Sequence, residues 1–330
     1  MLKFLFSFSF ILFISFSWAQ NETSVLFIGN SFTFMNNMPF MFRDIAESQG
    51  KKVFVDTVVE GGKDFDYHAH REETYKAINS RKWDYVIIQG HSNELAQPES
   101  IVNKKSLPFA KQIVDSIQAN SSCTQVVLYM TWGYKNGNPK WSAVANYDSM
   151  QTRITNQYMR FADLLNARIA PIGEVWKTIR KNYPGINLYH PDNIHPSFEG
   201  SYLISSTFYA AIFGESPIQN KAIVALSPDV RQIIESNIAQ VVLNNLNQWR
   251  FVQKSTQLKS GYDLVINGKE LKVYNTAQNS SWVEWNFGDG QISSDENPIH
   301  LYEAPGTYKF IQRVNMHCKS LDLIRTVEIK

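Results

Sequence analysis

The sequence predicts an α/β domain with a parallel sheet between two layers of helices, followed by a smaller all-β domain. Two observations support this fold class. Between residue 23 and about residue 250, β-like and helix-like segments alternate, which is typical of parallel strands joined by helical crossovers. Beyond residue 250, short β-like segments follow one another without a helix between them. We expect the first domain to span residues 20–250 and the second residues 251–330, with a linker near residues 251–262.

Five segments of the first domain have the composition of strands. The segment DYVIIQG at 84–90 is apolar on both faces, as expected for a central parallel strand. The other expected strands are the segments 24–29, 52–59, 124–132 and 168–173. Because ligands of such folds bind at the carboxyl ends of the strands, residues just past these ends are the first candidates for a site.

Helices are expected between and after these strands. The segment 196–214 has few polar positions, so we expect it to be largely buried. The segment 227–246 begins with Ser227 as a candidate N-cap and Pro228 in the first turn. The remaining expected helices span residues 39–50, 71–80, 106–120 and 146–167.

The second domain is expected to be a small β-sandwich. Its β-like segments lie at 271–275, 281–290, 306–314 and 323–329. Val283, Trp285 and Phe287 alternate toward one face, which is typical of a half-buried strand. Asp289 and Gly290 then provide a tight turn.

The first nineteen residues resemble a targeting segment. Lys3 precedes the apolar run FLFSFSFILFISFSWA, which closes on a small-x-small pattern at Ser17, Trp18 and Ala19. This pattern predicts a signal peptide, residues 1–19, cut after Ala19. A membrane anchor is the alternative, but the run is short for a spanning helix. We therefore expect a secreted or periplasmic protein whose mature chain has no membrane span.

The charge balance and the cysteine content limit which classes of partner and which type of scaffold the sequence supports. The chain has 32 lysines and arginines against 30 acidic residues, a net charge of +2. This balance gives no reason to expect a nucleic acid or an anionic membrane as a partner. Cys123 and Cys318 fall in different expected domains and could bridge in an oxidising compartment, although two cysteines do not make a disulfide-stapled scaffold.

Two separated stretches supply the parts of a nucleophilic catalyst. VLFIGNSF places Ser31 just past the end of the first expected strand. LYHPDNIHPSFEG places Asp192 three residues before His195, in a loop that leads into a helix. A serine hydroxyl needs a base to take its proton, and the base needs a carboxylate to hold its tautomer. We therefore predict Ser31 as nucleophile, His195 as base and Asp192 as the orienting carboxylate.

Donors for an oxyanion are also available past the strand ends. The backbone N–H of Ser31 is one, and an N–H at Gly61-Gly62, in the stretch VVEGGKDF, is a second because no side chain blocks its approach. The stretch IIQGHSNE adds the side-chain amides of Gln89 and Asn93. The sequence does not decide which of these two amides completes the oxyanion hole.

Taken together, these blocks resemble the SGNH/GDSL hydrolases. Gly29, Asn30 and Ser31 match the first block of that family with Asn in place of the more familiar Asp, and Gly62 matches the second. The late Asp-x-x-His block is present unaltered. The third block departs, because Ser92 stands where the oxyanion asparagine is expected. The resemblance implies a flavodoxin-like three-layer fold and ester hydrolysis by a Ser-His-Asp triad, with no cofactor and no metal.

The third block also suggests a substrate. Its sequence, QGHSN, resembles the QGESN motif of sialate O-acetylesterase-like enzymes. This resemblance implies that the substrate is an O-acetyl or other small acyl ester on a carbohydrate. His91 in this block, with Trp132 and Tyr134 after the fourth strand, could line the pocket and support a sugar ring; local packing is the alternative. Lipid or small acyl esters, and a non-catalytic glycan-binding or adhesive protein that keeps the fold, are the competing functions.

The C-terminal stretch resembles a PKD domain, an immunoglobulin-like sandwich. WNFGDG, NPIHLY and GTY occur in the order expected of that family. The resemblance implies a spacer or adhesive module, with a polysaccharide or a protein as its partner.

Metal-binding alternatives exist at three places. His190, Asp192 and His195 could form a zinc cluster, and His68 with His70 is a metal-like pair. An acidic residue in WNFGDG could suggest calcium, although turn chemistry explains it better. The SGNH-like blocks already account for the late cluster, so no metal is expected.

Overall fold

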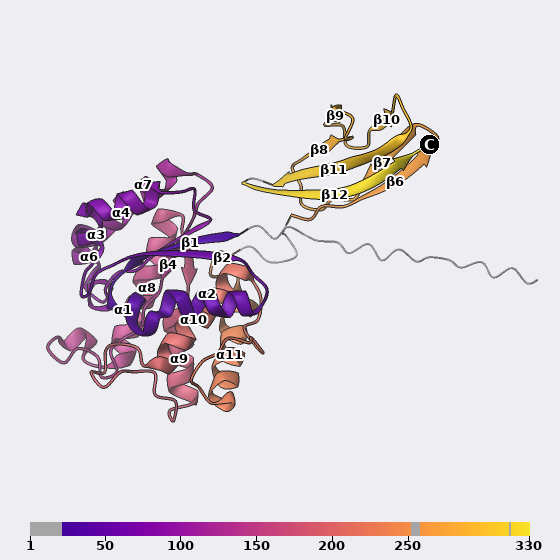
Figure 1. The fold of residues 1–330 in the computed structure, drawn as a ribbon. Coiled ribbons are helices and arrows are strands. Elements are labelled where there is room, and N and C mark those ends of the chain that lie inside the picture. Colours follow the sequence, from indigo (N-terminus) through magenta and orange to yellow (C-terminus); the bar gives the residue numbers. More distant parts are fainter. Residues whose placement is uncertain (1–21, 252–257, 317) are drawn as a thin grey trace, which may run out of the picture.

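The structure is a computed structural model that describes residues 22–251, 258–316 and 318–330 (Figure 1). The expected signal peptide lies outside the described residues, as does the middle of the expected linker. Within the described part of the chain, no helix has both the length and the apolar character needed to cross a bilayer.

The first domain is built on a five-stranded sheet with the order β2-β1-β3-β4-β5. All of its strand pairs are parallel. The strands are β1 (Thr23–Gly29), β2 (Val53–Val59), β3 (Tyr85–Ile88), β4 (Gln125–Tyr129) and β5 (Arg168–Ala170). All four residues of β3 are buried, as expected for the central strand.

Helices cover both faces of this sheet, which confirms the predicted fold class. In Figure 1, α2, α10 and α11 lie on one side of the strands, and α4 and α7 lie on the other. Six predicted helices are present: α2 (Met38–Ser48), α4 (Glu72–Asn79), α7 (Leu107–Asn120), α8 (Tyr147–Leu165), α10 (Phe198–Phe213) and α11 (Pro228–Val242). α10 is largely buried, as its composition predicts.

Several helices were not predicted, and most of them are short. They are α1 (Ser31–Phe34), α3 (Phe65–His70), α5 (Ser92–Leu95), α6 (Glu99–Lys105) and α9 (Ile172–Asn182), with 3-10 turns at Met35–Asn37, Ser142–Val144 and Leu243–Asn245. The expected strand 168–173 ends at Ala170, because Pro171 caps α9 and its helical geometry begins at Ile172. Single-turn helices give too few residues for a hydrophobic period to appear.

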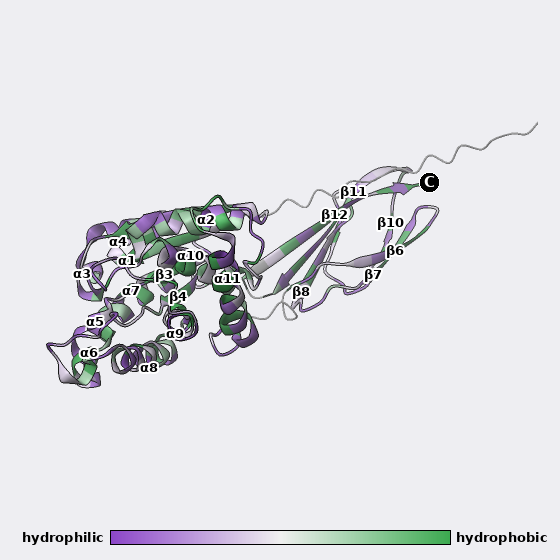
Figure 2. Cartoon of the chain, turned by 90° about the horizontal axis from the view of Figure 1, so that it is seen from below, coloured by the Kyte–Doolittle hydropathy of each residue, from purple (hydrophilic) through white to green (hydrophobic). Residues whose placement is uncertain are grey.

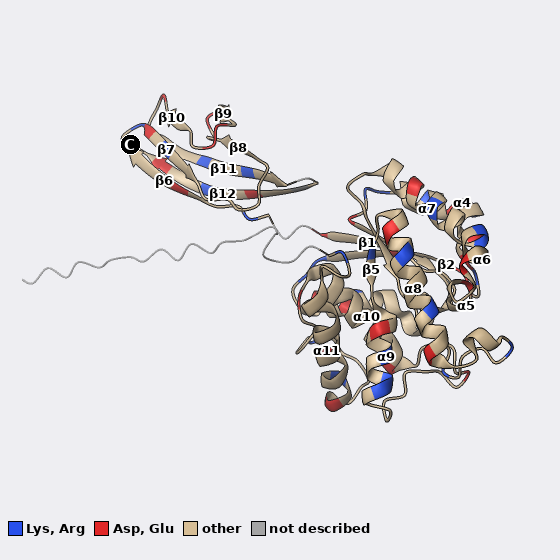
Figure 3. Cartoon of the chain, turned by 180° about the vertical axis from the view of Figure 1, so that it is seen from behind, with Lys and Arg blue, Asp and Glu red and all other residues tan. Residues whose placement is uncertain are grey.

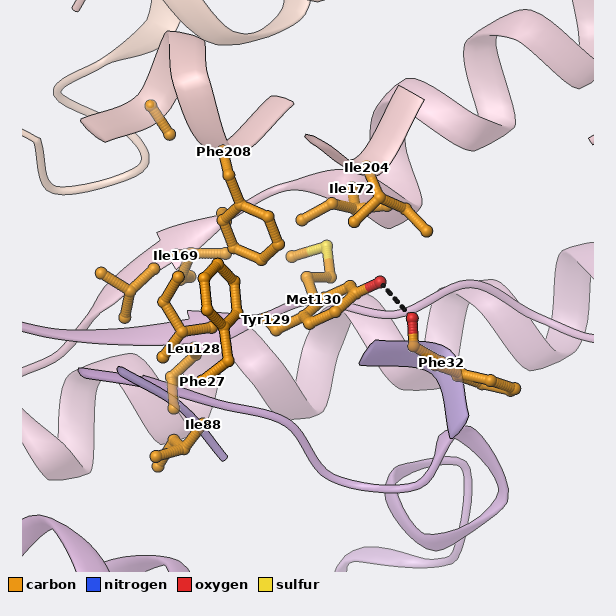
Figure 4. Close-up of a cluster of buried hydrophobic side chains, with 14 of the residues drawn as sticks. Phe27, Phe32, Ile88, Leu128, Tyr129, Met130, Ile169, Ile172, Ile204 and Phe208 are labelled. Carbon is orange, nitrogen blue, oxygen red and sulfur yellow. Dashed lines mark hydrogen bonds between the residues drawn. The ribbon is translucent and has the colours of Figure 1, made fainter. Parts of the chain in front are cut away.

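One part of the core of this domain lies between the sheet and α10. Phe208 of α10 meets Phe27 of β1 and Tyr129 of β4 edge-on, with ring centroids 5.3 and 5.0 Å apart (Figure 4). The buried Tyr129 hydroxyl donates a hydrogen bond to the carbonyl of Phe32, at 3.2 Å. The core is therefore tied to the turn that follows β1. In Figure 2 the hydrophobic residues, in green, gather around β3, β4 and α10.

The second domain consists of two antiparallel sheets with the orders β10-β7-β6 and β12-β11-β8-β9. The predicted inward row is confirmed, because Val283, Trp285 and Phe287 are 4%, 0% and 2% exposed. The strands β6, β9 and β10 were not predicted. The strands are β6 (Tyr262–Asn267), β7 (Glu270–Asn275), β8 (Trp282–Asn286), β9 (Ile292–Ser293), β10 (Ile299–Leu301), β11 (Gly306–Met316) and β12 (Lys319–Ile329).

A disulfide joins the two domains. Cys123, in the turn between α7 and β4, is bonded to Cys318, in the turn between β11 and β12. The sequence left this pairing open, since nothing local relates residues 195 positions apart. Acidic and basic residues are mixed along α7, α8 and α9 (Figure 3).

Candidate active site

The turn after β1 presents Ser31 at the carboxyl edge of the sheet. Asn30 caps α1: its side chain accepts a hydrogen bond from the N–H of Phe32 at 3.1 Å. Gly29 is required just before it, because an added Cβ would lie 2.5 Å from Thr33 Oγ1 and 2.6 Å from Gln89 Oε1. The sequence Gly-Asn-Ser thus ends the strand with a close backbone approach, a cap and a displayed hydroxyl.

Ser31, His195 and Asp192 lie in a hydrogen-bonded row. Ser31 Oγ is 2.8 Å from His195 Nε2, and His195 Nδ1 is 2.6 Å from Asp192 Oδ2. An ionised carboxylate only accepts hydrogen bonds, so the Nδ1 proton faces Asp192 and Nε2 is left to accept from the serine hydroxyl. The fold therefore brings together three side chains that the sequence places up to 164 positions apart.

The surroundings of Asp192 hold it as a carboxylate. Burial acts to raise its pKa, but hydrogen bonds from the backbone N–H groups of His195 and Ile194, and then the His195 ring, outweigh this and lower the pKa to about 2. Both N–H groups donate to Oδ1 at 2.9 Å. Asp192 Oδ1 thus holds the backbone of the loop, while Oδ2 faces the His195 imidazole. His190 Nδ1 lies 3.4 Å from the second oxygen.

The turn at residues 61–63 lies beside the turn that carries Ser31. The side-chain amide of Asn30 donates to the carbonyl of Lys63 at 2.8 Å. Gly62 has a φ of +68°, a conformation that favours glycine. His68, in the helix that follows this turn, makes a second contact with the segment around Ser31: its Nε2 lies 2.9 Å from the carbonyl of Gly29. Burial lowers the pKa of His68 to about 4, so the ring is neutral at pH 7 and its Nε2–H donates.

The two candidate side-chain amides occupy different positions. Gln89 is 1% exposed, and its Oε1 accepts from the N–H of Asn30 and from Thr33 Oγ1, while its Nε2 donates to the carbonyl of Gly90. Asn93 is only partly buried, and its Oδ1 accepts from the amide of Asn138 at 3.1 Å. Within the described residues, nothing accepts a hydrogen bond from Asn93 Nδ2.

Trp132 is not at the surface, which corrects its expected place under a sugar ring. It is 0% exposed and stacks on Trp176, with ring centroids 4.0 Å apart, and on Phe32 at 4.8 Å. Its Nε1 donates to the carbonyl of Ile194 at 3.1 Å, so it supports the loop that carries His195.

His91 and Tyr134 remain beside the site. Both are partly exposed, and their rings meet edge-on with centroids 6.5 Å apart. His91 also faces Phe32 at 6.0 Å, the residue after Ser31. Burial lowers the pKa of His91 and raises that of Tyr134 to about 12, so both side chains are neutral at pH 7.

The metal-like histidines do not converge. His68 is buried against Gly29, whereas the exposed His70 pairs with Asp66 at 2.8 Å. Asp289 accepts from Gln291 N–H and from His300, at 2.7 Å, within the β-sandwich. Over residues 22–251, 258–316 and 318–330, no group of three or more potential ligands is arranged to hold a metal ion.

Sequence reasoning missed His68 and Asn138 as supporting residues. The stretch DYHAH singles out His68, but the pattern suggests a metal, not a contact with a carbonyl 39 positions earlier. Asn138 carries no signal at all, because an asparagine in a Gly-Asn-Pro loop is ordinary turn chemistry.

Comparisons with known proteins agree with this architecture. Residues 261–320 match the model of the PKD domain. A DUF4886 family protein from Bacteroides uniformis is similar over 71% of this chain and 98% of its own, at 20% identity and a TM-score of 0.59. A protein assigned to the SGNH hydrolases, from Slackia heliotrinireducens, has 25% identity over 57% of this chain and 98% of its own, with a TM-score of 0.47.

A third solved structure is similar to the β-sandwich. The PKD1 domain of Vibrio anguillarum Epp is 22% identical over 22% of this chain and 93% of its own, with a TM-score of 0.21. No match was found among curated proteins. The fold class predicted from the sequence is confirmed: this chain combines a parallel α/β sheet with a C-terminal β-sandwich in which residues 261–320 match the PKD model.

Proposed function

We propose that this protein is a serine ester hydrolase in which Ser31, His195 and Asp192 form the catalytic triad. The observation that carries the proposal is the continuous hydrogen-bonded row from Ser31 Oγ through the imidazole to Asp192, with distances of 2.8 and 2.6 Å. These are the contacts that a nucleophile, a base and an orienting carboxylate require.

The mechanism has two halves that share one imidazole. Ser31 Oγ attacks the ester carbonyl while His195 Nε2 takes the hydroxyl proton; the tetrahedral intermediate collapses as His195 protonates the leaving alcohol. Water then attacks the acyl-serine, losing its proton to the same Nε2, and the acid leaves as Ser31 regains its proton. Asp192 stabilises the imidazolium in both halves because its low pKa keeps it ionised.

Three donors would hold the oxyanion. They are the backbone N–H groups of Ser31 and Gly62 and the side-chain amide of Asn93. We choose Asn93 over Gln89 because both ends of the Gln89 amide are already hydrogen-bonded inside the protein. The Gln89 side chain is also buried, at 1% exposed, so its second N–H is not accessible to a substrate.

The substrate we propose is a small acyl ester, such as an O-acetyl group, on a carbohydrate. The QGHSN block supports this choice, as do the neutral rings of His91 and Tyr134 beside the site. Gly62 also lines an open pocket of about 600 Å³, formed with residues 63–71 of the following segment, and in this proposal the rest of a bulky substrate lies there. In this proposal the PKD domain contacts polysaccharide or protein, and the leader-like segment and the disulfide fit an exported protein.

The test compares the mature protein with its Ser31→Ala variant. The wild type should hydrolyse p-nitrophenyl acetate and react with a fluorophosphonate probe at Ser31, and Ser31→Ala should lose both properties while keeping its melting temperature. Substitution of the nucleophile or base of such a triad costs roughly 10⁶ in turnover. Absence of turnover and labelling in the wild type would refute the proposal; acetate release from acetylated polysaccharides then tests the substrate.

A further inference from the structure

We propose that Asn138 is a positioning residue that fixes which end of the Asn93 amide faces the oxyanion. This inference rests on the proposed function and deepens it. Its basis is a series of linked hydrogen bonds. In this series, each bond identifies which end of the next side-chain amide is the donor. The series runs from a backbone N–H in the loop after β4 to Asn93 at the carboxyl edge of β3.

The first link fixes Asn138 itself. The backbone N–H of Lys140 lies 3.2 Å from Asn138 Oδ1, and a backbone N–H can only donate. The other end of the Asn138 amide is therefore Nδ2, a donor. That donor lies 3.1 Å from the Asn93 side chain, so the atom it meets must be the acceptor Oδ1. The Asn93 Nδ2 group consequently points away from Asn138.

The backbone of Asn93 is fixed independently. Its N–H donates to His91 Nδ1 at 3.1 Å, and its carbonyl accepts from Gln97 Nε2 at 3.2 Å. Glu94 closes the cap by accepting the His91 N–H at 3.2 Å. With the backbone and Oδ1 engaged, Nδ2 is the part of Asn93 left for a ligand. His91 places this turn against Phe32, next to Ser31.

The loop that carries Asn138 is held at several points. Gly137 has a φ of +70°, and an added Cβ would lie 2.4 Å from both Asn146 N and Val144 O. The Asn138 N–H donates to the carbonyl of Val144 at 2.7 Å. Such contacts give the amide a fixed base from which to orient its neighbour.

The same loop also contacts the loop of the triad. The N–H of Lys135 donates to the carbonyl of Asn193, between Asp192 and His195, at 2.9 Å. Arg180 donates to the carbonyl of Lys135 at 2.8 Å. One loop thus reaches both the proposed oxyanion donor and the proposed base, which explains how two strand-end segments keep a common geometry.

Asn138→Asp reverses this series with almost no change in shape. A carboxylate still accepts from Lys140 N–H, but its second oxygen also accepts, so Asn93 must turn its Nδ2 toward residue 138. The oxyanion would then face Asn93 Oδ1 instead of a donor. We expect kcat to fall by roughly 10²–10³, as for removal of one oxyanion donor, with KM changed less than about threefold.

The experiment measures kcat and KM for p-nitrophenyl acetate in the wild type, Asn138→Asp, Asn138→Ala, Asn93→Ala and the double variant Asn93→Ala with Asn138→Asp. Asn136→Asp is the matched control, because it adds the same charge two residues away on an exposed side chain. Melting temperatures check folding. Asn138→Ala should lose less than Asn138→Asp, because it frees the Asn93 amide without reversing it.

The double variant separates positioning from a general structural effect. Once Asn93 is alanine, Asn138→Asp should cost less than about twofold, because there is no amide left to turn. A full additional loss in the Asn93→Ala background, or an Asn138→Asp protein with wild-type kcat, overturns the positioning role. Failure of the proposed function looks different, since the wild type itself would then show neither turnover nor a labelled Ser31.

Discussion

At the residue scale, the site depends on small groups that allow close approach. Gly29 lets the end of β1 lie against Thr33 and Gln89, and the amide of Asn30 bonds both its own helix and the 61–63 turn. An Asp at position 30 would cap α1 equally well but could not donate to the carbonyl of Lys63. The unusual Asn of the first block therefore has a local structural reason.

Gly29→Ala should displace Ser31, the proposed nucleophile. The new Cβ would lie 2.5–2.6 Å from Thr33 Oγ1 and Gln89 Oε1, so the turn must shift. We expect a loss of about 1–3 kcal/mol in the free energy of unfolding and a fall in kcat of at least tenfold. Chemical denaturation and steady-state assays measure both. Gly185→Ala is the control, because nothing lies within 4 Å of its added Cβ; equal effects would contradict the steric argument.

At the element scale, short helices position several residues of the candidate site. α1 displays Ser31, α3 holds His68 against Gly29, and α5 carries Asn93. A four-residue helix such as α5 has little intrinsic stability, so its capping box between His91 and Glu94 is important. These short helices place the candidate site residues at the ends of the strands that the sequence predicts.

The cap of α5 should respond to pH through Glu94. Burial raises the pKa of Glu94 from 4.5 to about 8, so the folded protein keeps this proton at pH 7 while the unfolded chain releases it. Stability from this group is complete below pH 4.5 and is lost as the pH rises toward 8. The loss is roughly 1–4 kcal/mol.

Glu94→Gln should therefore be more stable than the wild type at pH 8 and close to it at pH 4.5. Glutamine preserves the acceptor for the His91 N–H but carries no titrating proton. Denaturation curves at the two pH values test this, with the exposed Glu47→Gln as control. A Glu94→Gln protein whose stability relative to the wild type does not change between these pH values would show that Glu94 is not the source of the dependence.

At the scale of the whole molecule, the proposed catalytic residues and the interdomain bond lie at opposite edges of the sheet. Ser31 follows the end of β1, whereas Cys123 lies two residues before β4 begins. Ser31 is thus at the carboxyl ends of the parallel strands and Cys123 at their amino ends, which lie on opposite sides of the domain. The disulfide therefore restrains the β-sandwich at a distance from the proposed catalytic residues.

Replacing both cysteines by serine should lower stability without impairing chemistry. The bond links residues 195 positions apart, and its removal is expected to cost about 2–5 kcal/mol. Turnover of p-nitrophenyl acetate at 25 °C should stay within about twofold. Calorimetry and steady-state kinetics on the double variant measure the two effects. A large fall in kcat with an intact fold would mean that the β-sandwich influences the site.

The sequence by itself determined the five strands of the parallel sheet, six of the helices, the two kinds of domain and the candidates Ser31, Asp192, His195 and Gly62. Periodicity and strand-end position carry this information because burial faces and turns are local properties. Only the tertiary structure decided that Ser31 meets His195, that Gln89 is spent internally, that Trp132 is buried and that Cys123 pairs with Cys318. Each of those outcomes is a contact between distant segments, set by strand order and loop packing, which no local pattern encodes.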